Sequence, residues 1–302
     1  MHYSAQQLVW NHLAVLRRPW LSSGMIPLRD YRTSRSFPTI TVILIAINLV
    51  VFLYQGYLTT RPSELNDGIT WQDAGFTPPA FDPNSYMLHV RGGGDPSLYP
   101  VSADDYFLLQ YALIPAELIG GQDLPPTVPV PLWLTLLTSM FMHGSLLHLI
   151  GNMLYLWIFG DNVEDAMGHA KFLAFYIVCG LIAAFAQIAT GISSAVPMIG
   201  ASGAIAAVLA AYFMLFPRSR VLTLVPIFFF IRLMNIPAVV LLGVWFLYQV
   251  LSGAGSLGAQ VGGTAWFAHI GGFVAGAVLV FVFRRRGVPI VLWQMVTSRR
   301  RI

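Results

Sequence analysis

The chain has 302 residues, of which 56% are hydrophobic and only 10% are charged, and its mean hydropathy is +0.68. Soluble domains carry about 25% charged residues, so this composition excludes a soluble globular protein and predicts an integral membrane protein. The single cysteine, Cys179, excludes an intramolecular disulfide framework. The net charge of +4 does not indicate nucleic-acid binding, because the arginines cluster beside apolar segments, where they orient membrane proteins.

The first 36 residues are polar to mixed and contain five arginines. They lack the apolar core and small-residue cleavage site of a secretory signal. We therefore predict a cytoplasmic extension over residues 1–36, whose first 24 residues are either an accessory segment or the product of an upstream start codon. Pro38 opens the first predicted membrane span, which runs to about residue 58.

Residues 59–131 form a polar insertion that holds nine of the thirteen acidic residues and two arginines. Glycine and proline clusters within it predict turns. We expect most of this insertion to be a flexible loop, with a short interfacial helix from Tyr106 to Leu113. Together with the residues up to 144 it would form the extracytoplasmic first loop.

Five further apolar segments predict membrane-spanning helices, since about 20 apolar residues cross a bilayer. The segment 217–235 holds three arginines around a short apolar patch and is predicted to be an interfacial turn. The predicted spans cover about 145–160, 171–190, 199–216, 236–252 and 265–283.

The arginines divide unevenly between the two sides of these six spans. The N-terminus has five, the 217–235 segment three and the C-terminus six, whereas the loops on the other side have two. This asymmetry places both termini in the cytoplasm. The sequence thus predicts an all-α protein of six transmembrane helices over residues 37–286, with a basic tail over 287–302. We expect it in a bacterial cytoplasmic membrane.

Four polar side chains within the predicted spans carry the functional hypothesis, because polar groups are costly in a bilayer. Ser202 lies between Gly200 and Gly203, and His269 precedes the G-x-x-x-G pair Gly272 and Gly276. Small residues allow helix backbones to approach closely, so the two side chains could come within hydrogen-bonding reach. The glycine-framed serine is either a packing residue or a nucleophile. Of the four polar side chains, the remaining two are His148 and Asn152, both in the predicted span 145–160.

A serine beside a neutral histidine is the minimal activated nucleophile, because the imidazole takes the hydroxyl proton during attack. The predicted spans around these residues offer no carboxylate, so the site would be a dyad. His148 and Asn152 are four residues apart and share a helical face, from which both could donate to an oxyanion. A metal site at His143 and His148 is not expected, because a spacing of five does not fit one helical face.

The chain resembles the rhomboid family of intramembrane serine proteases in four stretches that occur in the family's order. The match covers roughly residues 37–286. The stretches are His143-Gly-Ser-Leu-Leu-His148-Leu-Ile-Gly-Asn152, Phe159-Gly-Asp-Asn-Val-Glu164-Asp165, Gly200-Ala-Ser202-Gly203 and Ala268-His269-Ile-Gly-Gly272-Phe-Val-Ala-Gly276.

The resemblance implies a six-helix fold with an outward-facing cavity, and it assigns Ser202 as the nucleophile and His269 as the general base. The oxyanion hole would comprise His148, Asn152 and the backbone N–H of Ser202. His143 would support the first external loop. Glu164 would order a cytoplasmic turn. The substrates would be membrane proteins cut in or near a transmembrane segment, and no cofactor or metal is implied.

The sequence departs from the family pattern at two places. Where many members have Trp-Arg in the first loop, this chain has Leu134 and Thr135, and where some have a tyrosine beneath the histidine, it has Ala206. His269 must therefore be oriented by another group. The main alternative is a non-catalytic rhomboid-like protein that binds or delivers client membrane proteins. A solute transporter would instead need charged or broken helices at the midplane, and we see neither.

Overall fold

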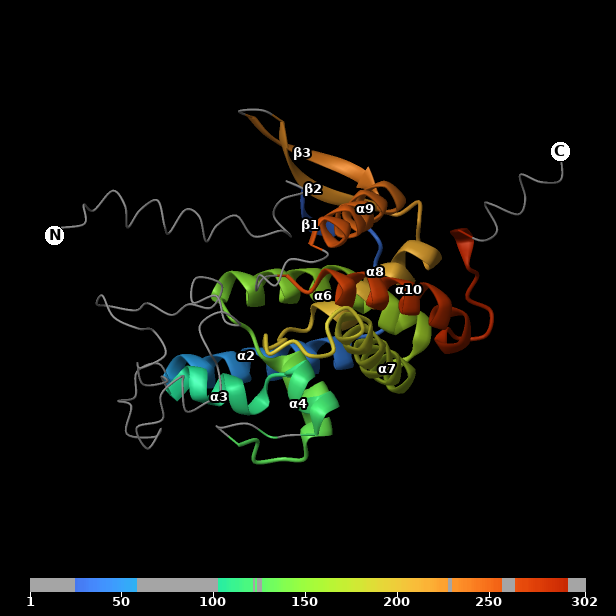
Figure 1. Ribbon diagram of the computed structural model, residues 1–302. Helices are drawn as coiled ribbons and strands as arrows, with labels where there is room; N and C mark the ends of the chain where they lie inside the picture. Colours follow the sequence, from blue (N-terminus) through green and yellow to red (C-terminus); the bar gives the residue numbers. More distant parts are fainter. Residues whose placement is uncertain are drawn as a thin grey trace.

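The computed structural model describes residues 25–58, 103–121, 123, 127–227, 230–256 and 264–292. The predicted segment 1–24, most of the first loop and the arginines at 299–301 lie outside these residues. The structure is mostly helical (Figure 1). The longer helices are α2 (Thr39–Leu58), α6 (Leu146–Met167), α7 (His169–Ile188), α8 (Ser202–Leu215), α9 (Ala238–Ser256) and α10 (Trp266–Phe283).

Each of the six predicted spans overlaps one of these helices. Four of them, α2, α7, α9 and α10, are long and apolar enough to cross a membrane. A fifth span is formed if α6 is joined to the helical stretch Leu132–Phe141, from which it is bent by 81°. Helix α8 has only 14 residues, or about 21 Å at 1.5 Å per residue, which is shorter than a typical hydrocarbon core. The four or five candidate spans, without α8, already make the chain a multi-pass membrane protein.

Helix α8 is the centre of the bundle and packs against α6, α7, α9 and α10. Nearly all of its side chains are buried, and five of its 14 residues are alanines. This small-residue surface lets α10 approach almost backbone to backbone. A Cβ atom on Gly272 would lie 2.1 Å from the carbonyl oxygen of Gly203, and one on Gly276 would lie 2.4 Å from that of Ala207. The G-x-x-x-G spacing thus marks a true helix contact.

The prediction of an all-α protein is wrong, because the described residues also contain a three-stranded antiparallel sheet. Its order is β1 (Ile26–Asp30), β2 (Arg220–Ile227) and β3 (Phe230–Pro237). The segment 217–235, predicted as a turn, instead forms most of a hairpin. Pro226 argues against a strand in the sequence, because proline has no N–H to donate within a sheet. The structure tolerates it because β1 pairs with β2 only as far as Leu224, so Pro226 interrupts no β1 ladder.

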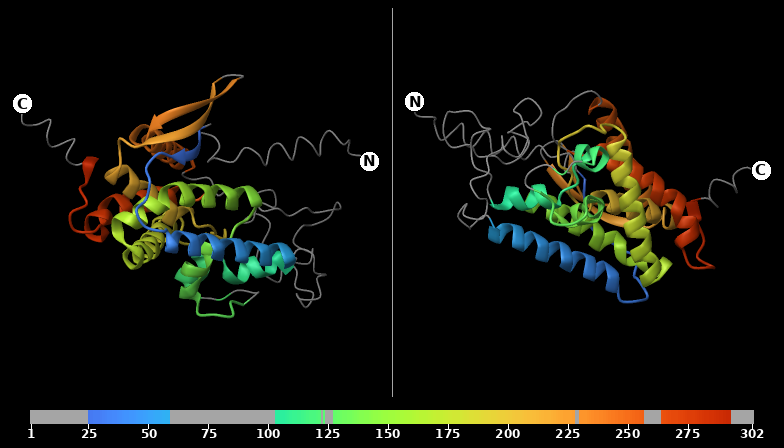
Figure 2. Two further views of the ribbon diagram at one scale, coloured as in Figure 1. Left: turned by 180° about the vertical axis from the view of Figure 1, so that it is seen from behind. Right: turned by 60° about the horizontal axis from the view of Figure 1, so that its bottom comes forward.

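Strand β1 connects the N-terminal segment to the bundle. In Figures 1 and 2 the sheet and α9 lie on one side of the α6–α8–α10 layer, whereas α2 and α3 lie on the other. Asp30 accepts hydrogen bonds from the Tyr212 hydroxyl on α8 at 2.7 Å and from the Asn162 amide on α6 at 3.0 Å. Arg32 lies over the ring of Phe216, 3.9 Å from its centroid. The end of α8 is thereby held to α6.

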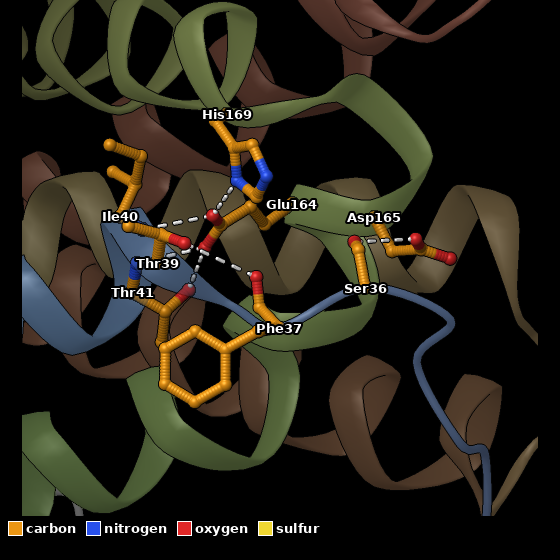
Figure 3. A network of polar contacts seen from close by, with 8 residues as sticks. All are labelled: Ser36, Phe37, Thr39, Ile40, Thr41, Glu164, Asp165 and His169. Carbon is orange, nitrogen blue, oxygen red and sulfur yellow. Dashed lines mark hydrogen bonds and ion pairs between the residues drawn. The ribbon is translucent and has the colours of Figure 1, made fainter.

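The start of α2 is fixed by a carboxylate on α6. Glu164 accepts hydrogen bonds from the backbone N–H groups of Ile40 and Thr41 at 2.9 and 2.8 Å, and from the Thr41 hydroxyl at 2.7 Å (Figure 3). His169 on α7 also contacts this carboxylate. Because the first N–H groups of a helix have no partner within it, Glu164 acts as a cap supplied by another helix.

The described part of the first loop is folded onto the bundle. It contains α3 (Ala103–Tyr111), which confirms the helix predicted there, and α4 (Pro115–Gly120). Leu113 exchanges two backbone hydrogen bonds with Met198, and the N–H of Ala116 donates to Ser194. This part of the loop therefore packs against the segment that leads into α8, whereas residues 59–102, where a flexible loop is predicted, lie outside the described residues.

Candidate active site

Ser202 is the first residue of α8, because the chain turns at Gly200 just before the helix begins. Gly200 has φ of +119°, a conformation that favours glycine, and its N–H donates to the carbonyl of Ser139 at 2.8 Å. The predicted span began at residue 199, but this turn delays the helix until Ser202. The N–H groups of the first helical turn have no acceptor within the helix, so they are free to face an anion beside Ser202.

The structure brings His269 to Ser202. His269 lies in the first turn of α10, and its Nε2 atom is 2.7 Å from Oγ of Ser202. This contact depends on the close approach of α8 and α10 at Gly203, the residue after Ser202, and Gly272, three residues after His269. His269 is buried, with 6% of its surface exposed. The pair is thus a hydroxyl and an imidazole joined by a hydrogen bond in an apolar bundle.

His148 and Asn152 lie beside the loop that precedes Ser202. A Cβ atom on Gly200 would lie 2.9 Å from Nε2 of His148 and 3.8 Å from Nδ2 of Asn152. A side chain at position 200 would therefore not fit between the backbone and the side chains of His148 and Asn152. The Asn152 amide is 2.8 Å from Nε2 of His143, whose ring is buried. His143 therefore orients Asn152, in addition to donating its backbone N–H to Gln55 at 3.2 Å.

Two glutamines near His269 were not recognised in the sequence analysis. Gln249 on α9 has its Oε1 atom 2.8 Å from Nδ1 of His269. Gln187 on α7 accepts hydrogen bonds from the N–H groups of Phe267 and Ala268, so it caps α10 just before the histidine. Both lie in predicted spans, where the cost of a polar side chain is a signal that could have identified them.

Glu164 lies away from this site. It is twelve residues after Asn152 on α6, or about 18 Å along the helix. Its contacts are with the start of α2 and with His169, so it stabilises the other end of the bundle. The remaining glycine predicted to support the site, Gly276, lies at the second close contact of α10 with α8.

The comparison with known protein families gives a match to the Rhomboid domain over residues 131–286, which is just over half of the chain. The chain belongs to the rhomboid family. This segment includes Ser202, His269, His148 and Asn152, whereas the β1 strand and α2 lie before it. The rhomboid segment therefore contains the whole candidate site but not the elements that brace α6 and α8.

Several curated rhomboid proteins are similar to the chain. The presenilin-associated rhomboid-like protein, mitochondrial, of Homo sapiens is 38% identical over 100 residues, which cover 32% of this chain and 26% of that relative. Rhomboid protease GluP of Bacillus subtilis is 32% identical over 149 residues, covering 48% and 27%. Rhomboid protein 1, mitochondrial, of Saccharomyces cerevisiae is 28% identical over 178 residues, covering 57% and 45%. The chain thus spans less than half the length of these relatives.

Proposed function

We propose that the chain is an intramembrane serine endopeptidase that cleaves membrane-anchored proteins in or near a transmembrane segment. The observation that carries this proposal is the 2.7 Å contact between Oγ of Ser202 and Nε2 of His269 inside an apolar bundle. The name of the Bacillus subtilis relative, a rhomboid protease, agrees with it. Ser202 attacks the scissile carbonyl, and His269 takes its proton and later gives it to the leaving amine.

The developing oxyanion has donors on two sides. The N-terminus of α8 supplies the backbone N–H of Ser202, and α6 supplies the side chains of His148 and Asn152. Removing one such donor from a soluble protease costs about 2.7–4 kcal/mol of transition-state stabilisation. The hydrogen bond between Asn152 and His143 holds that amide in place before substrate binds. His269 must be neutral to act as the base, so cleavage is lost at acidic pH.

The proposal includes six membrane crossings, with both termini in the cytoplasm. The pairing of β1 with β2 supports an even number of crossings between them, because paired strands share one side of the membrane. Helices α2, α6, α7 and α8 lie between the two strands. Three crossings would leave the two strands on opposite sides of the membrane, so the pairing supports counting the short helix α8 as a span.

The three relatives named above come from mitochondria and from a bacterium. They do not support a bacterial cytoplasmic membrane over a mitochondrial one. The bacterial location therefore stays a prediction from the sequence.

The test compares wild-type protein with Ser202→Ala, each purified and mixed with a membrane-anchored reporter substrate. A fluorophosphonate probe for activated serines is applied in parallel, so the result does not depend on the choice of reporter. Ser252→Ala, which changes a half-buried serine on α9, is the matched control. We expect cleavage and labelling in wild type and the control, and neither in Ser202→Ala. Equal signals from all three would refute the protease and favour the non-catalytic client-binding alternative.

A further inference from the structure

We infer that Gln249 positions His269 for catalysis by fixing the tautomer and the orientation of its imidazole, an inference that rests on the proposed protease function. Oε1 of Gln249 is 2.8 Å from Nδ1 of His269, and Nε2 of the same ring is 2.7 Å from Ser202. The three side chains come from α9, α10 and α8 and form one continuous chain of hydrogen bonds. Gln249 occupies the place that an acidic residue takes in a catalytic triad.

The direction of the hydrogen bond determines which nitrogen of the ring carries the proton. A carbonyl oxygen can only accept, so Nδ1 of His269 must donate to Oε1 of Gln249. A neutral imidazole has one N–H, and Nε2 is then left with a lone pair directed at the Ser202 hydroxyl. This is the tautomer that a general base requires.

The orientation of the Gln249 amide is itself fixed by a second contact. Its Nε2 atom donates to the carbonyl oxygen of Trp245 on the same helix at 3.4 Å. Turning the amide over would direct its oxygen at that carbonyl and its NH₂ group at Nδ1, which would force the proton onto the nitrogen facing Ser202. The arrangement with Oε1 toward His269 satisfies both ends of the amide and leaves the base unprotonated where it acts.

Burial makes this contact difficult to replace. Gln249 has 1% of its surface exposed, so water cannot substitute for it at Nδ1. The rings of Trp245 and Trp266 lie 6.0 and 6.4 Å from that of His269 and give it apolar neighbours. An amide orients the imidazole without bringing a charge into the bundle, where an unpaired carboxylate would be costly. It also supplies the orienting group that Ala206 cannot.

The experiment replaces Gln249 with methionine, which has a similar shape but no acceptor, and with glutamate, which keeps an oxygen at the same place. Gln249→Met is expected to lower kcat by about 10²-fold, the lower end of what a general base contributes. KM should change little, because Gln249 touches the base and not the substrate. Gln249→Glu should recover most of kcat, and its carboxylate should stabilise the protonated imidazole and move the acid limb of activity to higher pH. Because a second ionisable imidazole, that of His148, also lies near this site, only the difference between variants is diagnostic.

A spectroscopic measurement makes the result independent of any substrate. The ¹⁵N chemical shifts of His269, assigned by comparison with His269→Ala, should report a proton on Nδ1 in wild type and a mixture of tautomers in Gln249→Met. Thermal unfolding of each variant shows whether the fold is kept. Unchanged kcat and an unchanged tautomer in Gln249→Met would overturn the inference while leaving the protease intact. If the proposed protease function itself were wrong, wild type and Ser202→Ala would show equal cleavage, which is a separate outcome.

Discussion

Replacing Gly272 by alanine is expected to separate the side chains of Ser202 and His269 without changing either residue. Gly272 follows His269 by three residues, and the carbonyl it faces belongs to Gly203, the residue after Ser202. The new Cβ would lie 2.1 Å from that oxygen, whereas ordinary contact begins at 3.4 Å. Helix α10 must therefore retreat from α8 by about 1.3 Å.

The hydrogen bond at the site cannot absorb this movement. Starting from 2.7 Å, the separation of Oγ and Nε2 would approach 4.0 Å if the whole shift were along the bond, beyond hydrogen-bonding range. A misplacement of about 1 Å costs roughly 10²-fold in rate. Overpacking costs about 1–3 kcal/mol in stability.

The assay measures reporter cleavage, fluorophosphonate labelling and thermal unfolding in the same detergent for wild type and Gly272→Ala. Gly243→Ala is the matched control, since a Cβ there would meet only Phe213 at 3.9 Å. We expect about a hundredfold loss of activity in Gly272→Ala and little change in the control. Activity within threefold of wild type would show that the helices yield without moving the dyad, and the reasoning from close contact would then be wrong.

Two further predictions concern the bracing of the bundle. Glu164→Gln directs an NH₂ group at donors on α2, so it should lower the free energy of unfolding by about 2 kcal/mol. Thermal unfolding compares this variant with Asp165→Asn. Asp165 accepts one hydrogen bond, from the Ser36 hydroxyl at 2.8 Å, so its replacement should lower stability less. Burial raises the pKa of Asp30 from its ordinary 3.8, although the Tyr212 hydroxyl and nearby arginines oppose the shift. The stability that Asp30 contributes is therefore present at pH below 3.8 and lost as the pH rises through its raised pKa. Wild type should thus lose stability relative to Asp30→Asn between acidic and neutral pH, and a difference that grows in the opposite direction would contradict this.

The sequence predicted the helices well because long apolar runs have few alternatives in a membrane. The pairing of Ser202 with His269 was also predictable, since glycine at the neighbouring positions indicated that their helices could touch. Gln249 was not predicted, because glutamine is neither a nucleophile nor a base, although a lone amide in an apolar helix is as costly as the other polar side chains there. The length of α8 was overestimated because the turn at Gly200 is set by tertiary contacts, among them the hydrogen bond to Ser139.

The sheet was missed for a different physical reason. Strands β1 and β2 pair residues almost 200 positions apart, as Ile26 with Leu224, and no local pattern encodes such a partner. The apolar residues of the hairpin resembled an incomplete membrane segment. The carboxylate of Asp30 also gave no sign that it would receive a hydrogen bond from Tyr212 on a distant helix.

The pairing of β1 with β2 has a consequence for how the protein is made. Ribosomes add residues from the N-terminus, so β1 is synthesised long before its partner strand exists. Its partner β2 is absent until α2, α6, α7 and α8 have been synthesised. The pairing of β1 with β2 and the Asp30–Tyr212 hydrogen bond can form only after α8 and β2 have been synthesised. Strand β1 therefore joins the sheet late and stabilises helices that have already been made.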